Sequence, residues 1–246
     1  MSSAPTAIVQ ARMTSTRLPG KVMKRVLGRP LLSYVIERLQ RVRDDVRVVV
    51  ATTTNAGDDA IEILCRDMGV PIFRGSEHDV LDRTAKAAAR YQADPVIRVT
   101  SDCPLIDPGV TRVVLERYEL GGCDYVANTL TRSYPRGMDT EVLSARVLRI
   151  SDVEATKPHE REHVTPFVYE HPDRFRLCNV ENERDLSGYR LTVDTPEDFS
   201  LVTAIYERLS PTEPSFGMSD VIALLDRDEG LRGLNAAVEQ KPLGGQ

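Results

Sequence analysis

Short runs rich in valine and isoleucine alternate with helical patterns along most of the chain. Residues 6–10, 46–51 and 96–100 are the clearest runs, and a segment whose apolar residues recur at helical spacing lies between each run and the next strand. Strands connected by helices pair in parallel, because each helix carries the chain back along one face of the sheet. The alternation therefore predicts an α/β fold with a mixed, mainly parallel sheet flanked by helices.

The remaining elements follow from the same periodicities. The predicted strands lie at residues 6–10, 46–51, 70–73, 96–100 and 125–128, and the predicted helices at residues 30–42, 58–68, 80–91, 107–120, 144–154, 160–169, 196–209 and 218–226. Residues 132–139 are predicted to form a loop, and residues 174–193 two strands joined by a polar turn. Asp194 or Thr195 is placed to supply the N-cap oxygen of the helix at 196–209.

The chain contains no long linker, so we expect a single domain. This domain would span residues 1–226, with residues from about 130 to 190 forming a small inserted lobe, and residues 227–246 would be a C-terminal tail.

Composition excludes several classes of function. The 246-residue chain is 41% hydrophobic but has no run of about 18 apolar residues, and its N-terminus lacks a secretory signal, so we expect a cytoplasmic protein with no membrane partner. A net charge of −5, 5% aromatic residues and no tryptophan argue against a general nucleic-acid binder. Four widely spaced cysteines, Cys65, Cys103, Cys123 and Cys178, predict reduced packing residues rather than a disulfide framework or a zinc knuckle.

Positive charge is concentrated at the N-terminal end. The first 36 residues carry six cationic and no acidic side chains, whereas the other 210 residues carry 26 cationic and 37 acidic ones. Within this segment, residues 10–21 follow the first strand with three cations, three hydroxyls and a Pro-Gly turn. That mixture suits the phosphates of a nucleotide, although neither the Gly-x-x-x-x-Gly-Lys-Ser/Thr nor the Gly-x-Gly-x-x-Gly motif is present.

The same loop resembles a known signature. Residues 11–21, Ala-Arg-Met-Thr-Ser-Thr-Arg-Leu-Pro-Gly-Lys, are similar to the N-terminal motif of the CMP-sugar synthetases, the acylneuraminate-type cytidylyltransferases, and above all to their SpsF-like spore-coat polysaccharide group. Further motifs follow in the family's order: Gly-Ser-Glu-His-Asp-Val-Leu-Asp-Arg at 75–83, Thr-Ser-Asp-Cys-Pro at 100–104, Arg-Glu-His-Val-Thr-Pro at 161–166, and Leu-Thr-Val-Asp-Thr-Pro-Glu-Asp-Phe at 191–199. The resemblance extends from residue 7 to residue 209.

This resemblance implies a Rossmann-like, GT-A-like nucleotidyltransferase fold and a homodimer that transfers CMP from CTP with the help of Mg²⁺. The CTP-binding positions that it implies are Ala11, Arg12, Met13, Ser15, Arg17, Lys21, Thr52, Thr53, Ser76, Asp82 and Arg83. The acceptor-binding positions are Arg136, Gly137, Asp139, Glu141, Arg161, Glu162 and His163, in the inserted lobe. The acceptor itself stays open between keto-acid sugars and small phosphonates.

Two carboxylates are candidate metal ligands. Asp102 follows the strand at 96–100, and Asp194 ends the second strand predicted within 174–193. Carboxylates at strand ends suit Mg²⁺, which takes oxygen ligands and shares its coordination shell with phosphates. A turn residue at Asp102 and a helix cap at Asp194 are the alternatives, but the resemblance favours metal binding and places Arg12 and Lys21 beside this pair as catalytic residues.

Three other functions need to be considered. His159-Glu-Arg-Glu-His163 matches the zinc motif His-Glu-x-x-His, but Pro158 and Pro166 interrupt the long helix which that motif requires. A glycosyltransferase that uses a nucleotide sugar would carry Asp-x-Asp after a central strand, whereas Asp226-Arg-Asp228 lies near the tail. A non-catalytic nucleotide-binding protein would bind CTP without turnover, and the retention of all the phosphate cations together with both candidate metal ligands argues against it.

Overall fold

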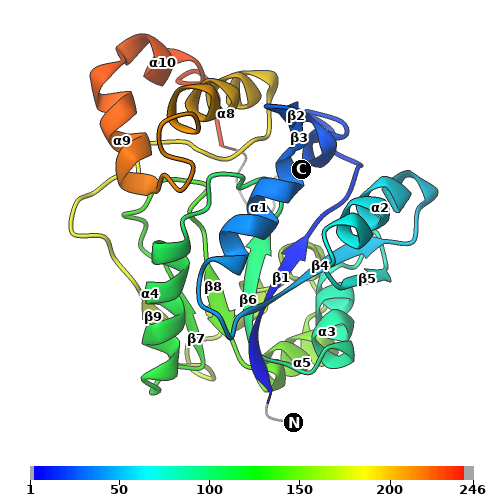
Figure 1. The fold of residues 1–246 in the computed structure, drawn as a ribbon. Helices are drawn as coiled ribbons and strands as arrows, with labels where there is room; N and C mark the ends of the chain where they lie inside the picture. Colours follow the sequence, from blue (N-terminus) through cyan, green and yellow to red (C-terminus); the bar gives the residue numbers. More distant parts are fainter. Residues whose placement is uncertain (1–2, 241–246) are drawn as a thin grey trace.

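A seven-stranded sheet runs through the centre of the molecule (Figure 1), in the order β5-β4-β1-β6-β8-β7-β9. The computed structural model describes residues 3–240. The strands are β1 (Ala4–Gln10), β4 (Arg47–Thr53), β5 (Ile72–Gly75), β6 (Ala93–Thr100), β7 (Tyr125–Ala127), β8 (Glu141–Leu143) and β9 (Leu177–Asn179). The first four are parallel and β8 is antiparallel to both of its neighbours, so the sheet is mixed and mainly parallel, as predicted.

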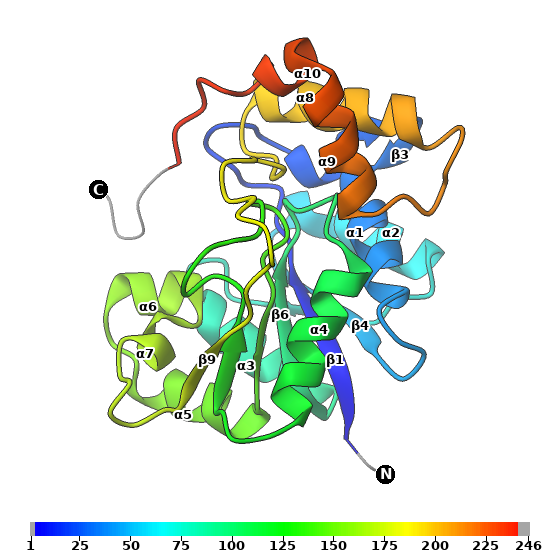
Figure 2. The same ribbon diagram turned by 90° about the vertical axis from the view of Figure 1, so that its left-hand side faces the viewer.

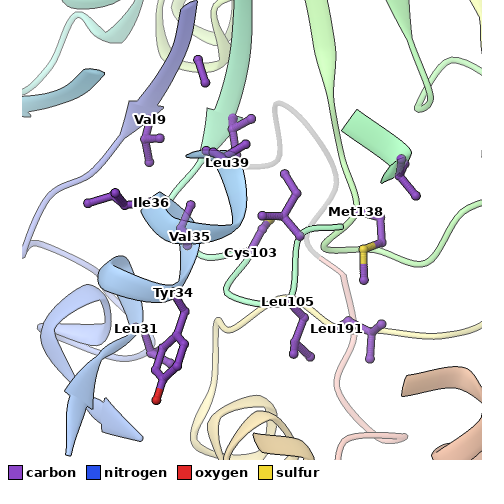
Figure 3. Packing of buried hydrophobic residues seen from close by; sticks show 14 of the residues in the cluster. Val9, Leu31, Tyr34, Val35, Ile36, Leu39, Cys103, Leu105, Met138 and Leu191 are labelled. Atoms are coloured by element: carbon purple, nitrogen blue, oxygen red, sulfur yellow. The ribbon is translucent and has the colours of Figure 1, made fainter. Parts of the chain in front are cut away.

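Helices cover both faces of this sheet, because successive residues of the central strands point to opposite sides. Ala7 and Val9 of β1 belong to one apolar core, together with residues of α1 (Leu31–Gln40), α4 (Pro108–Glu119) and α8 (Pro196–Leu209). Figure 3 shows part of this core, with Val9 near Ile36 and Leu39. Ile8 belongs to the second core, with residues of α3 (Val80–Arg90) and α5 (Ala145–Glu154).

The other elements are short or lie at the ends of the sheet. They are η1 (Lys21–Met23), β2 (Arg25–Val26), β3 (Arg29–Pro30), η2 (Ala56–Asp58), α2 (Asp59–Asp67), α6 (Pro158–His163), α7 (Pro166–Tyr169), α9 (Met218–Arg227) and α10 (Glu229–Gly233). Helices α8, α9 and α10 lie together beyond the end toward which β1 points (Figures 1 and 2). No helix within residues 3–240 has both the length and the apolar character that crossing a bilayer requires.

Most predicted elements are confirmed, but the second half of the chain needs corrections. Residues 174–193 contain only β9, since residues 189–193 form an extended segment whose amides bond to the carbonyls of Arg136 and Asp102 instead of to a neighbouring strand. Strand β8 was not predicted; it is defined by antiparallel pairing with β6 and β7, which are distant from it in sequence. The helix predicted at 160–169 is divided into α6 and α7, because Val164 adopts a positive φ of 74° before Pro166.

The C-terminal end departs from the prediction as well. Helix α10 lies where only a tail was expected, and Leu231 is buried there against the helices. The predicted domain limits stay a prediction, and residues 241–246 of the tail lie outside the described residues.

The prediction that all four cysteines are reduced was wrong. Cys123 and Cys178, which are 55 residues apart in sequence, form a disulfide with a Cα–Cα distance of 6.0 Å. They meet because β9, which contains Cys178, pairs in parallel with β7, which begins two residues after Cys123. Cys65 and Cys103 are free and buried, as expected of packing residues.

Candidate active site

The loop at residues 11–20 is held in one conformation at the end of β1. The Ala11 amide bonds to the Ala51 carbonyl at 3.1 Å, and the Gly20 amide to the Met13 carbonyl at 2.9 Å. Gly20 has a φ of 67°, which a residue without a side chain adopts at no steric cost, so the turn that returns the chain to η1 favours glycine. The Met13 amide donates to buried Asp58 at 2.7 Å, which anchors the loop to η2.

Lys21, at the end of this loop, reaches both candidate metal ligands. Its ammonium group lies 3.0 Å from the Asp102 carboxylate and 2.8 Å from the Asp194 carboxylate, and it donates to the Val193 carbonyl at 2.9 Å. Arg17 pairs with the other oxygen of Asp194 at 2.9 Å. The fold thus joins two of the predicted phosphate cations, Arg17 and Lys21, to the predicted metal carboxylates, although Lys21 and Asp194 are 173 residues apart. Arg12 instead donates to the Glu77 carbonyl at 3.5 Å.

The charges in this cluster stabilise one another. Burial by itself would raise the pKa of Asp102, but the positive charge of Lys21 and hydrogen bonds from Thr100, Lys21 and Cys103 outweigh it and hold that pKa at about 2. Burial likewise works against the charge of Lys21, yet Asp102 and Asp194 raise its pKa. Both Asp102 and Lys21 are therefore ionised at neutral pH.

The donor set at this position fits a magnesium ion. The oxygens of Asp102 and Asp194 both face one cation, the ammonium group of Lys21, so they converge on a common position. Carboxylate oxygens are the ligands that Mg²⁺ prefers, and phosphate oxygens commonly complete its coordination shell. Asp194 does not cap α8, because Thr195 accepts the cap hydrogen bond from the Asp198 amide at 3.3 Å.

Asp194 is held in place by a buried ion pair that the sequence did not reveal. Asp198 is fully buried and accepts hydrogen bonds from Arg190 at 2.9 Å and from the backbone amide of Asp194 at 2.9 Å. Arg190 also donates to the Asp194 carboxylate at 3.0 Å. In the sequence, Asp198 was recognisable only as one of two acidic residues in the first turn of the predicted helix at 196–209, and no motif marked Arg190.

A small cavity opens beside the two carboxylates. It measures about 120 Å³, and its lining includes Asp102, Asp194, Arg136, Gly137 and Asp139. These last three residues belong to the predicted acceptor loop, so the structure brings that loop to the candidate metal site.

The loop approaches closely because it contains glycine. Gly137 has a φ of 101°, and a Cβ atom at this position would lie 2.6 Å from the carbonyl carbon of Leu191. Arg136 makes no side-chain hydrogen bond or ion pair within residues 3–240, and burial and the nearby charge of Arg132 lower its pKa. Arg132 instead pairs with Asp139 at 2.6 Å. Arg136 thus offers a positive charge that forms no direct ion pair within the described residues, although Asp139 lies close enough to act on it electrostatically.

The other predicted acceptor residues do not line this cavity. Glu141 is buried on β8, where it pairs with Arg98 at 2.5 Å and accepts from Thr165 at 2.6 Å. Arg161 binds Asp79 at 2.6 Å and Asp152 at 2.8 Å and so ties α6 to α3 and α5. Glu162 and His163 end α6, and burial lowers the pKa of His163. Their roles toward an acceptor stay predictions.

The residues predicted near the nucleoside differ in whether their polar side-chain atoms have hydrogen-bond partners. Ser76 accepts from the Asp79 amide at 3.1 Å, Asp82 pairs with Lys86 at 2.7 Å, and Thr53 bonds to Asp58. By contrast, the hydroxyl of Thr52 and the Nε atom of Arg83 are buried without a hydrogen-bond partner within the described residues. Burial and the charge of Arg12 lower the pKa of Arg83 to about 10. Unpaired buried polar atoms are uncommon and suit a ligand that would complete them.

The zinc motif does not form a zinc site. Within residues 3–240, His159, Glu160 and Glu170 lie close enough to share a metal ion, but His163 is not part of this group. Lys157 already supplies positive charge there, 3.1 Å from Glu160 and 3.2 Å from Glu170. The Glu160 carboxylate accepts a hydrogen bond from the backbone amide of Lys157 and so caps the six-residue α6. Glu160 is therefore not placed to act as a base.

The chain matches known proteins over almost its whole length. A family model described as cytidylyltransferase matches residues 6–239. The spore coat polysaccharide biosynthesis protein SpsF of Bacillus subtilis is 35% identical over 228 residues, covering 90% of this chain and 93% of SpsF.

Solved structures agree with these matches. The structure of a cytidylyltransferase from Leptospira borgpetersenii has a TM-score of 0.88 and 32% identity, and the match covers 97% of this chain and all of that one. A CMP:2-keto-3-deoxy-manno-octonic acid synthetase solved in complex with CTP has a TM-score of 0.65 at 19% identity, with 84% of this chain and 99% of that chain covered, which shows a shared fold.

Proposed function

Because the chain belongs to the cytidylyltransferase family, we propose that it transfers the CMP group of CTP to a small acidic acceptor in an Mg²⁺-dependent reaction that releases pyrophosphate. The observation that carries this proposal is the position of Lys21, between Asp102 and Asp194 and at the end of the phosphate loop. The cavity that contains both carboxylates also contains Arg136, so groups suited to a nucleotide, a metal and an anionic acceptor are adjacent.

The cations of the loop bind the triphosphate in this proposal. Arg12, Arg17 and Lys21 neutralise its oxygens, and the backbone amides of the loop and the Ser15 hydroxyl orient it. Arg17 and Lys21 balance the charge of Asp102 and Asp194 in the described structure, and they exchange these partners for phosphate when CTP binds. Mg²⁺ bound by the two aspartates would neutralise charge that develops on the α-phosphate.

The acceptor lies in the cavity with its acidic group on Arg136. Arg136 suits a carboxylate or a phosphonate because a guanidinium group binds either through paired hydrogen bonds. An oxygen of the acceptor attacks the α-phosphorus, the bond from that phosphorus to the oxygen bridging to the β-phosphate breaks, and pyrophosphate leaves. Where the attacking group is a hydroxyl, its proton passes to water. Keto-acid sugars and small phosphonates both satisfy this chemistry.

Pyrophosphate release from each of the four nucleoside triphosphates tests the proposal. The reactions contain Mg²⁺ and, in turn, KDO, N-acetylneuraminate, legionaminate or phosphonoformate, with Asp102→Ala as the inactive control. We expect release from CTP only, dependent on an acceptor, abolished by EDTA and lost in the variant. A protein that binds no CTP by calorimetry would contradict the proposal. Tight CTP binding without release from any acceptor would mean either that the panel lacks the true acceptor or that the protein is non-catalytic.

Sedimentation velocity addresses the assembly that we also propose, a homodimer. This expectation comes from the resemblance to the CMP-sugar synthetases. A monomer at micromolar concentration would contradict it without affecting the proposed reaction.

A further inference from the structure

The last described residues return from α10 to the candidate active site. Figure 2 shows residues 234–240, in red, descending from α10 toward the level of the sheet. Asn235 is buried and anchors this segment, because its side-chain amide donates to the Arg190 carbonyl at 3.1 Å and to the Asp198 carboxylate at 2.8 Å. The segment is therefore fixed to the same ion pair that holds Asp194.

Gln240 is the second residue that connects this segment to the candidate active site. Its side-chain oxygen accepts a hydrogen bond from Arg190 at 2.6 Å, through the guanidinium nitrogen that does not contact Asp194. Gln240 also lines the cavity of about 120 Å³ that contains Asp102, Asp194 and Arg136. The segment 234–240 thus contributes one wall of the cavity in which the acceptor is proposed to bind.

On the basis of the proposed function, we propose that Gln240 is a specificity-determining residue that contacts the acceptor, with its side chain held in place by Arg190. Its amide is uncharged, whereas the charged side chains of the cavity wall are one cation, Arg136, and three carboxylates, Asp102, Asp139 and Asp194. The net charge of this wall affects how well it accepts an anionic ligand, because charges separated by a few ångströms repel or attract one another. A neutral residue at 240 adds no further negative charge to that which Arg136 already opposes.

Two substitutions at this position test the proposal by steady-state kinetics, with KDO, N-acetylneuraminate and phosphonoformate as acceptors. Gln240→Glu places a negative charge beside the acceptor, and we expect it to raise the acceptor KM by about tenfold or more while kcat and the KM for CTP change by less than about twofold. Gln240→Ala removes the contact without adding charge, and we expect a rise of about threefold. Glu239→Ala is the matched control, since Glu239 is exposed and does not line the cavity.

Comparing the acceptor KM with kcat and the KM for CTP distinguishes a residue that contacts the acceptor from one that only supports the fold. A residue that only supports the fold would lower kcat and the affinity for CTP together. An acceptor KM that is unchanged in both Gln240 variants would overturn the proposal.

Failure of this proposal and failure of the proposed function are distinguishable. A wild-type protein that binds no CTP would contradict the proposed function, whereas a wild-type protein that uses an acceptor with the same KM as both variants would overturn only the role of Gln240.

Discussion

Lys21 joins the phosphate loop to both candidate metal ligands. It ends the phosphate loop and contacts Asp102, Asp194 and the Val193 carbonyl. Removing it would leave two adjacent carboxylates without their shared cation and the triphosphate without one of its charges. We expect Lys21→Gln to lower kcat/KM for pyrophosphate release from CTP by about 100-fold or more, as for other residues that stabilise transition-state charge.

The control for this prediction is Arg25→Gln. Arg25 belongs to the same positive segment but is exposed, and within residues 3–240 its side chain bonds only to the nearby Gly28 carbonyl. A loss of similar size in both variants would mean that the net charge of the segment matters and not the position of Lys21.

Asp102 gives the site a dependence on pH that stability measurements can detect. Its pKa falls from an ordinary value of 3.8 to about 2 in the folded protein. The lowered pKa contributes up to about 2 kcal/mol of stability at neutral pH, which is lost as the pH falls from about 4 toward 2 because protonation then favours the unfolded chain. We expect the free energy of unfolding to fall less steeply over this range in Asp102→Asn than in the wild type, as measured by urea titration. Parallel curves would contradict the role of Lys21 in holding this charge.

At the scale of elements, the approach of the acceptor loop to residues 191–192 forms the cavity. Gly137→Ala would place a methyl group against the Leu191 backbone at a residue with positive φ, so both strain and overlap oppose it. We expect a loss of about 2–4 kcal/mol in the free energy of unfolding, measured by denaturant titration. We also expect a smaller increase in pyrophosphate release when the acceptor is added.

Gly188→Ala is the matched control for this change. A Cβ atom at Gly188 would meet nothing within 4 Å, so we expect an effect below about 1 kcal/mol. Equal stability of the two variants would show that the loop does not pack against residues 191–192 as described.

At the scale of the whole molecule, the Cys123–Cys178 disulfide joins the loop before β7 to β9. Thiol titration in guanidinium without reductant should find two free cysteines, Cys65 and Cys103, and four after reduction. Because the disulfide closes a loop of 55 residues, Cys178→Ser should lower the free energy of unfolding by about 4 kcal/mol in the chain-entropy model. Four free thiols before reduction would contradict the pairing.

The sequence alone determined the order of the main strands and helices, because hydrophobic periodicity and helix caps are properties of neighbouring residues. The same holds for the loop at residues 10–21 and for Asp102 and Asp194, whose places at the ends of predicted elements marked them as candidates. Strand β8 and helix α10 were not predicted, because each is short and its place depends on contacts with segments distant in sequence.

Only the tertiary structure decided which of these groups meet. The contact of Lys21 with both aspartates, the buried pair of Arg190 and Asp198, and the return of Gln240 to the cavity all join segments that are distant in sequence or carry no local pattern. The pairing of Cys123 with Cys178 likewise follows from the parallel alignment of β7 and β9. The physical reason is that ion pairs and disulfides depend on how the layers pack, whereas periodicity reports only which face of each element is buried.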